Sequence, residues 1–108
     1  DVVAHIEHAL NVCGEDHVGL GTGGGTTSID DLEAYKSALA KEHDERVAKG
    51  IAAAGERADT HPFVDDLRGP DQFRKLYRLL AARGHKPARL EKILGQNFVR
   101  YARDIWGA

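Results

Sequence analysis

Residues 16–26 read DHVGLGTGGGT, a short apolar stretch that runs into a tract of glycines. The alternation from His17 to Gly21, with the β-branched Val18 inside it, predicts a short β-strand over residues 17–21. Three consecutive glycines are costly to order in a helix or a strand, so Gly23–Gly25 and the residues up to Ser28 are expected to form a loop. The stretch therefore predicts one strand that leads directly into a flexible loop.

Gly19, Gly21 and Gly24 also spell G-x-G-x-x-G, the fingerprint of a dinucleotide-binding loop. Such a loop needs its first glycine at the turn after the strand and an acidic residue at the end of a second strand. Here Gly19 lies inside the apolar run, and a charged helix is predicted where the second strand would be. No lysine follows the glycines, so a P-loop is excluded as well. The pattern favours a strand-to-helix loop without a nucleotide.

Helices are predicted on both sides of this stretch from apolar spacing and from Gly or Pro at their ends. They cover residues 2–13, about 28–49 with Ser28 or Asp30 as cap, 70–83, 86–94 and 98–106, with an irregular connection over 51–68. A single strand leaves its backbone donors and acceptors unpaired. Either the strand pairs with a copy of itself, or its sheet lies in sequence that is missing here.

Composition narrows the class of protein. The 108 residues suit one domain at most, and 42% apolar with 30% charged residues is typical of a soluble globular chain. A net charge of -2 gives no pull toward nucleic acid or an anionic membrane, and no run is long enough to cross a bilayer. The single Cys13 excludes an internal disulfide. The chain contains no Met, which suggests a processed product or a piece of a longer protein.

Neither a zinc site nor a nucleic-acid-binding motif is favoured by the sequence. His5 and His8 can share one helix face, which is compatible with a zinc pair, but a closed site needs two more ligands and the other His residues and Cys13 are scattered. The tail, with Arg100 and Arg103, faintly resembles a helix-turn-helix. Its second helix is occupied by apolar residues, so a helical hairpin that packs into the core is the favoured interpretation: Phe98, Tyr101, Ile105 and Trp106.

With these elements in place, the chain resembles the carboxy-terminal third of the renal (membrane) dipeptidase family, particularly its bacterial members. The segments that support the resemblance are HIEHALNVCGEDHVGLGT at residues 5–22, the RGPDQF helix start at 68–73 and LEKILGQNF at 90–98. The helix from about residue 28 and the GIAAAGE stretch that ends at residue 56 resemble an insertion of the bacterial relatives. Residues 28–56 are therefore expected to be a helical insertion in a single segment, 1–108.

The resemblance implies a fold and a cofactor. Members of the family are (β/α)8-barrel metallohydrolases that cleave dipeptides, usually with two zinc ions. The chain would then be an α/β segment, mostly helical, in which residues 17–21 form the last barrel strand. The family's metal ligands belong to upstream segments, so this chain alone is expected to hold no zinc. His5 and His8 would lie on an outer helix and not in the metal site.

The resemblance also draws attention to Gly23. In the family, the residue after the Gly-Ser or Gly-Thr pair that ends this strand is an aspartate, which exchanges a proton beside the metal-bound water. Gly23 has no proton to exchange, and Thr22 is a poor substitute at neutral pH. Thr22 and Gly24 would belong to the substrate-binding loop. Inactivation of a true dipeptidase and drift to another task both explain Gly23, and the retained framework favours inactivation.

The sequence thus predicts the C-terminal part of a zinc-dependent dipeptidase, inactive by itself. Its expected partners are the remainder of its own barrel and a dipeptide substrate, with a homodimer as a further option and with no nucleic acid or membrane. The alternative is a non-catalytic helical assembly or interaction domain whose strand pairs across a dimer. The resemblance leaves the compartment open between bacterial cytoplasm and export.

Overall fold

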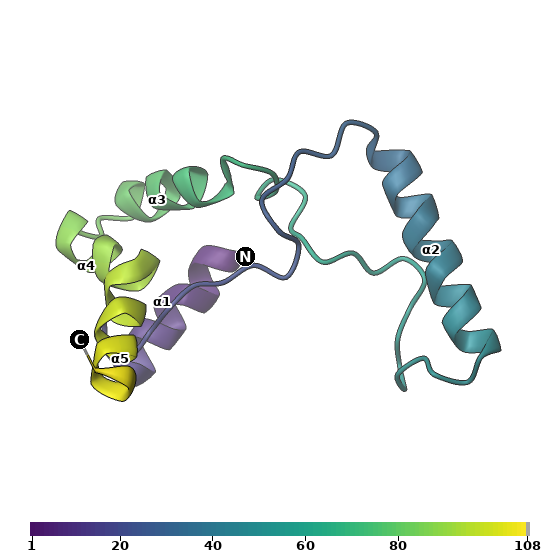
Figure 1. Cartoon of the computed structure of the whole chain (residues 1–108). Helices are drawn as coiled ribbons and strands as arrows, with labels where there is room; N and C mark the ends of the chain where they lie inside the picture. Colours follow the sequence, from purple (N-terminus) through teal and green to yellow (C-terminus); the bar gives the residue numbers. More distant parts are fainter. Residues whose placement is uncertain (108) are drawn as a thin grey trace. The chain divides into compact units, whose positions relative to one another are not determined.

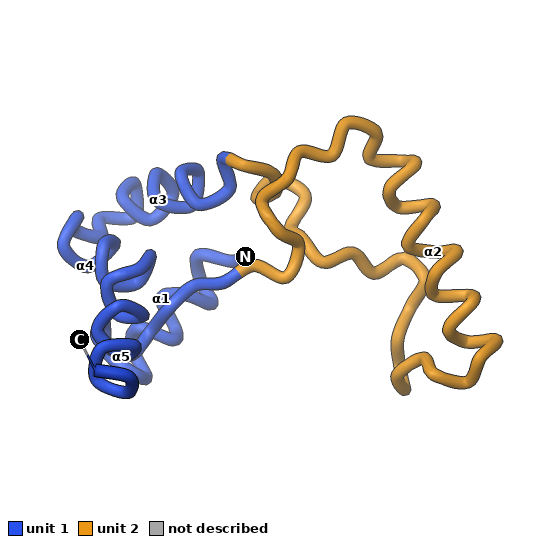
Figure 2. Tube along the Cα trace, in the orientation of Figure 1, with its two compact units in different colours: residues 1–21, 71–108 blue, residues 22–70 orange. Residues whose placement is uncertain are grey.

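A computed structural model describes residues 1–107 as five α-helices and one π-helical segment (Figure 1). The elements are α1 (Val2–Cys13), α2 (Leu32–Ala48), α3 (Gln72–Ala82), α4 (Pro87–Glu91), η1 (Lys92–Gln96) and α5 (Asn97–Trp106). The chain divides into two compact units (Figure 2). Unit 1 combines Asp1–Gly21 with the stretch from Asp71 onward, and unit 2 is Thr22–Pro70. None of the described helices is both long and apolar enough to span a membrane.

The described residues form no β-sheet, so the predicted α/β fold with residues 17–21 as the last strand of a (β/α)8 barrel is wrong. An isolated antiparallel bridge between Val64 and Leu67 is the one β feature in residues 1–107. Backbone groups of the predicted strand bond to helical elements instead. Leu20 N donates to Ile93 O at 3.2 Å, and the Asn97 side chain donates to Val18 O at 2.8 Å. Because a helical partner takes these bonds, the segment stays irregular.

Helix α1 confirms the prediction for residues 2–13. The Asp1 carboxylate accepts from Val3 N at 3.0 Å and so caps the first turn. Gly14 ends the helix with a φ of 80°, a value that glycine adopts without steric cost. Val3, Ile6 and Leu10 recur at helical spacing and are buried, so α1 presents one apolar stripe to the core of unit 1.

The core of unit 1 lies among α1, α3, α4 and η1. Leu80, Leu90 and Ile93 have no exposed surface, and Leu76 is buried beside them. These residues lie in the helices predicted over 70–83 and 86–94, although α3 begins at Gln72 rather than at Pro70. Gly95 interrupts the last helical stretch with non-helical backbone angles, as its position in the sequence predicts. The break lies inside η1 and separates α4 from α5.

Unit 2 consists of α2 and long irregular connections. The Asp31 carboxylate caps α2 by accepting from Ala34 N at 2.9 Å, so the cap is neither Ser28 nor Asp30. No residue of α2 is buried. The helix is joined to the following segment by Glu56, whose carboxylate accepts from Arg46 at 2.6 Å and from Ala53 N at 2.9 Å. Polar contacts therefore join α2 to the following segment, and no residue of this unit is fully buried.

Candidate functional site

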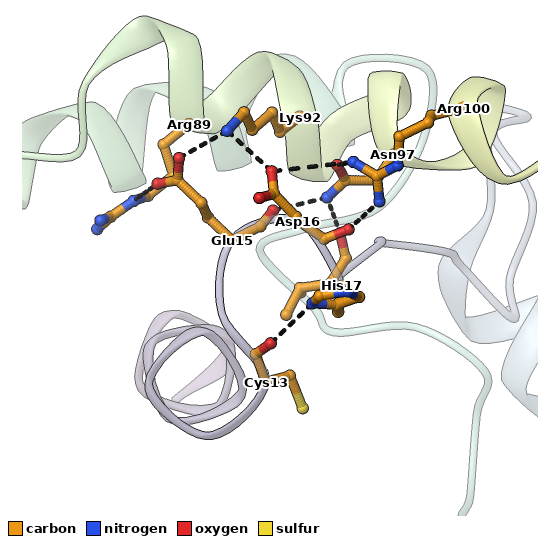
Figure 3. A network of polar contacts seen from close by, with 9 residues as sticks. Cys13, Glu15, Asp16, His17, Arg89, Lys92, Asn97 and Arg100 are labelled. Atoms are coloured by element: carbon orange, nitrogen blue, oxygen red, sulfur yellow. Dashed lines mark hydrogen bonds and ion pairs between the residues drawn. The ribbon is translucent and has the colours of Figure 1, made fainter.

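The segment that precedes the glycine tract is anchored in unit 1 by one buried amide. The side chain of Asn97, at the start of α5, is only 6% exposed as a residue. Its amide nitrogen donates to Glu15 O at 2.7 Å and to Val18 O at 2.8 Å (Figure 3). One side chain thus donates hydrogen bonds to two backbone carbonyls that have no neighbouring strand to bond to.

Five charged side chains surround this amide and fasten the same segment (Figure 3). Glu15 pairs with Arg89 at 2.7 Å and with Lys92 at 2.8 Å. Lys92 also reaches the Asp16 carboxylate at 2.8 Å. Arg100 donates to the Asp16 carbonyl and lies 3.8 Å from its carboxylate. Three cations from α4, η1 and α5 therefore hold two consecutive acids.

The cations lower the pKa of both acids. The hydrogen bond from Lys92, followed by that from Arg89, lowers the pKa of Glu15 to about 2. Lys92 lowers the pKa of Asp16 in the same way, first through its hydrogen bond and then through its charge. Asp16, in turn, is the largest cause that raises the pKa of Lys92. Both carboxylates stay ionised at neutral pH and act as anchors of the segment, not as proton donors.

An aromatic ring lies against Gly19. A Cβ built on Gly19 would lie 2.4 Å from Cζ of Phe98 and 2.6 Å from its Cε2, far inside normal contact. The ring belongs to a side chain that is 54% exposed, so it can move aside for a methyl group. The first glycine of the apparent fingerprint thus packs against α5, and a small side chain there would require the Phe98 ring to shift.

Gly24 lies close to backbone atoms of Pro62 and not to a side chain that can move. A Cβ on Gly24 would lie 2.5 Å from Pro62 O and 3.3 Å from Cβ of Phe63. A carbonyl cannot swing away as a ring can, so this position requires glycine as long as Pro62 stays where it is. Gly24 N also donates to the Thr22 hydroxyl at 3.2 Å, which closes the loop on itself. The loop is therefore shaped within unit 2 by the Pro62–Phe63 backbone.

Gly23 lies between these constraints and has room for a side chain. Its nearest neighbours would be Pro62 O at 3.7 Å and Pro62 Cβ at 3.9 Å from a built Cβ, which is ordinary contact. Its φ lies outside the left-handed region, whereas that of Gly25 is +67°. Thr22, Gly23 and Gly24 form one short loop, and no helix begins at it, because α2 starts only at Leu32. The anion site of a dinucleotide loop is therefore missing from this part of the described chain.

The histidines do not form a metal centre. Residues 1–107 contain no group of three or more His, Cys, Asp or Glu side chains placed to hold one ion. His5 and His8 are exposed on α1, and the ring of His17 is 3.1 Å from Cys13 O. His85 is paired with Glu7 at 3.1 Å. These residues do not fit the two zinc ions that the dipeptidase resemblance implies.

The apolar face of α5 is exposed, which corrects the prediction that it packs into the core. The exposed fractions are 54% for Phe98, 64% for Tyr101, 58% for Ile105 and 82% for Trp106. Asn97, on another side of the same helix, is the residue that unit 1 buries. Arg100, considered above for nucleic acid, is committed to Asp16 and Asn97. The polar side of α5 therefore faces the rest of unit 1, and its apolar side is left exposed within that unit.

Sequence reasoning missed the anchoring role of Asn97 and its cationic neighbours. The usable signal was weak: two adjacent acids at Glu15 and Asp16, and basic residues that recur at helical spacing from Arg89 to Arg100. Such charge runs are usually solvated faces. Nothing local indicates that the two runs, more than seventy residues apart, meet.

The chain was compared with known proteins at three levels. No family model matches it, and neither a curated protein nor a solved structure does so.

Proposed function

We propose that this chain is the C-terminal part of a zinc-dependent dipeptidase, which hydrolyses dipeptide amide bonds through a metal-activated water. The observation that supports the proposal best is that two of its most distinctive motifs meet. Asn97, in LEKILGQNF, donates at 2.8 Å to Val18, in DHVGLGT. Segments that form one site are expected to be joined by such buried contacts. The proposal requires no strand within these residues.

The zinc ligands would come from sequence outside these 108 residues, since the described side chains do not fit a zinc centre. No step of the reaction is therefore assigned to residues of unit 1. Its proposed task is positional: Asn97 and the cations around it fix the segment that leads into the glycine loop.

The glycine loop would carry the group that exchanges a proton with the substrate. At Gly23 that group is absent, and loss of a positioned acid or base typically costs about 10²- to 10⁴-fold in rate. The Thr22 hydroxyl already accepts from Gly24 N at 3.2 Å and has no ionisable character near neutral pH. The room around Gly23 allows a carboxylate to be restored there.

Restoring the carboxylate tests the proposal. In the longer protein, loaded with zinc, Gly23→Asp should raise dipeptide hydrolysis at least about tenfold, because a general acid or base is regained. Gly23→Asn is the matched control, since it has the same size without a titratable group. Metal content measured for all three proteins separates a loss of zinc from a loss of proton transfer. Equal rates for all three would contradict the proposed role of this position.

The isolated 108-residue chain provides a second check. Supplied with zinc, it should hydrolyse no dipeptide, because the described residues offer no metal-binding group. Zinc-dependent turnover by the pure chain would show that the ligands lie within it and would overturn their assignment to other sequence.

A non-catalytic interaction domain is the second candidate, and the exposed face of α5 favours it. Large aromatic residues that stand uncovered on one helix face are typical of a protein interface. Under this hypothesis the pure chain is a homodimer through α5. Sedimentation equilibrium of the chain and of Tyr101→Glu distinguishes the two candidates. A dimer that the substitution dissociates favours the interaction domain, and a monomer in both cases contradicts it.

A further inference from the structure

Unit 2 contains a cavity that the proposed hydrolase does not use. It has a volume of about 430 Å³ and lies between α2 and the segment from Ala58 to His61. This volume is within the range of small-molecule sites, which combine an apolar lining with a few polar groups. Six of the eight residues that line it form two sets with different chemistry, and Asp59 and His61 complete the lining.

One set provides hydrogen-bond donors. It consists of the Lys36 ammonium and the hydroxyls of Ser37 and Thr60, called here the donor set. The Lys36 nitrogen lies 3.9 Å from the Asp65 carboxylate, beyond hydrogen-bond distance. The structure shows no hydrogen bond to either hydroxyl within the part of the chain that it describes. The donor set is therefore equipped to bind an acceptor from outside the chain.

The other set is apolar. It consists of small and branched side chains, called here the apolar wall: Leu39, Ala40 and Ala58. It offers contact to a short aliphatic group and leaves no polar group to be satisfied there. A ligand that fits both sets has an anionic or carbonyl end and a short hydrocarbon end.

The surrounding charges disfavour a ligand with more than one negative charge. Asp59 is neutralised by Arg57, whose guanidinium donates to both carboxylate oxygens. Asp65 faces Lys36 at 3.9 Å and the His61 ring at 3.2 Å. The two formal cations thus balance the two carboxylates, and a dianion such as phosphate would meet the acids without a surplus of positive charge.

We propose that this cavity binds a small monocarboxylate with a short branched alkyl chain. The carboxylate accepts hydrogen bonds from the donor set, and the alkyl chain lies on the apolar wall. The site is independent of the proposed dipeptidase activity and needs no metal, so it can be tested on the 108-residue chain itself.

The first test is a titration of the isotope-labelled chain with 3-methylbutanoate, followed by amide NMR shifts at constant ionic strength. Saturable shifts are expected in α2 and around residues 58–61, with a Kd on the order of millimolar for a ligand of so few atoms. 3-Methylbutan-1-ol, which keeps the alkyl chain, and inorganic phosphate, which keeps the charge, should each bind at least about fivefold more weakly. No saturation by the carboxylate, or equal binding of either comparison ligand, overturns the proposal.

The second test uses two lysines of the same helix. Lys36→Gln should weaken 3-methylbutanoate binding about tenfold or more, because the charged donor is lost. Lys41→Gln is the matched control, since Lys41 is exposed on α2 and does not line the cavity. Unchanged shifts in the unliganded variants, outside the residues next to each substitution, confirm that both are folded. Equal weakening by the two substitutions would mean unspecific counterion binding and would contradict the site.

Discussion

The two units of this chain are stabilised by different kinds of contact. In unit 1, α1, α3, α4 and η1 bury a common set of aliphatic side chains, and three of these, Leu80, Leu90 and Ile93, have no exposed surface. In unit 2 no side chain reaches that degree of burial. Its contacts are the Glu56 hydrogen bonds, the tilted Tyr35 and Phe63 rings at 5.8 Å, and the approach of Gly24 to Pro62.

This difference shows which parts of the chain can tolerate change. A core of aliphatic side chains gives a unit much of its free energy of unfolding, whereas exposed polar contacts contribute little. Unit 1 is therefore expected to open rarely, and unit 2 to exchange its amide protons faster. Loops that must adapt to a ligand are drawn from segments of this second kind.

The largest effect is expected in the core of unit 1. Leu90→Ala should lower the free energy of unfolding by about 2–5 kcal/mol, through lost apolar transfer and the cavity that remains. Leu79→Ala is the matched control on α3, where the side chain is 47% exposed and little burial is lost. Denaturant unfolding followed by far-UV circular dichroism measures both. Similar losses for the two variants would contradict the assignment of the core.

A smaller effect is expected at the buried amide. Asn97→Ala leaves the carbonyls of Glu15 and Val18 without their donor, which costs about 1–3 kcal/mol. Asn11→Ala, on the exposed side of α1, should change stability little. Hydrogen exchange should rise around residues 15–20 and not in α2. A global loss without this local signature would show that Asn97 does not anchor the segment.

The smallest effect is expected from acid. The hydrogen bond from Arg83, followed by that from His85, lowers the pKa of Glu7 from 4.5 to about 2. In the folded state the Glu7 carboxylate is therefore protonated at a lower pH than in the unfolded state. This stabilisation is present above pH 4.5 and is lost as the pH falls toward 2. Glu7→Gln should flatten the stability profile in that window, while Glu33→Gln, exposed on α2, should not. Identical profiles for both variants would contradict the role of Glu7.

Local features could be predicted from the sequence. The helical spacing of Val3, Ile6 and Leu10 and the break at Gly95 depend on neighbours in the chain, and both are found in the structure. The prediction of a strand at residues 17–21 was wrong because a strand needs a partner strand to bond to. Val18 and Leu20 bond to helical elements instead.

Distant features could not be predicted. The periodicity of α5 defines its apolar face but does not say what covers it, so Tyr101 was expected in the core and is exposed. The hydrogen bond from Asn97 to Val18 joins residues 79 positions apart, and no local sequence pattern predicts it. The glycine loop was an intermediate case: its conformational freedom was evident, but the reason for Gly24 lies in Pro62.

Packing against Pro62 shapes the glycine loop and leaves Gly23 as a position that accepts a carboxylate. Amide hydrogen exchange of Gly23→Asp and Gly24→Asp in the 108-residue chain measures this difference. We predict that Gly23→Asp leaves the exchange of unit 2 unchanged, because a Cβ there has its nearest neighbour at 3.7 Å. Gly24→Asp should accelerate exchange around residues 61–67 and spare unit 1, because its Cβ would meet Pro62 O at 2.5 Å. Equal exchange in the two variants would contradict the claim.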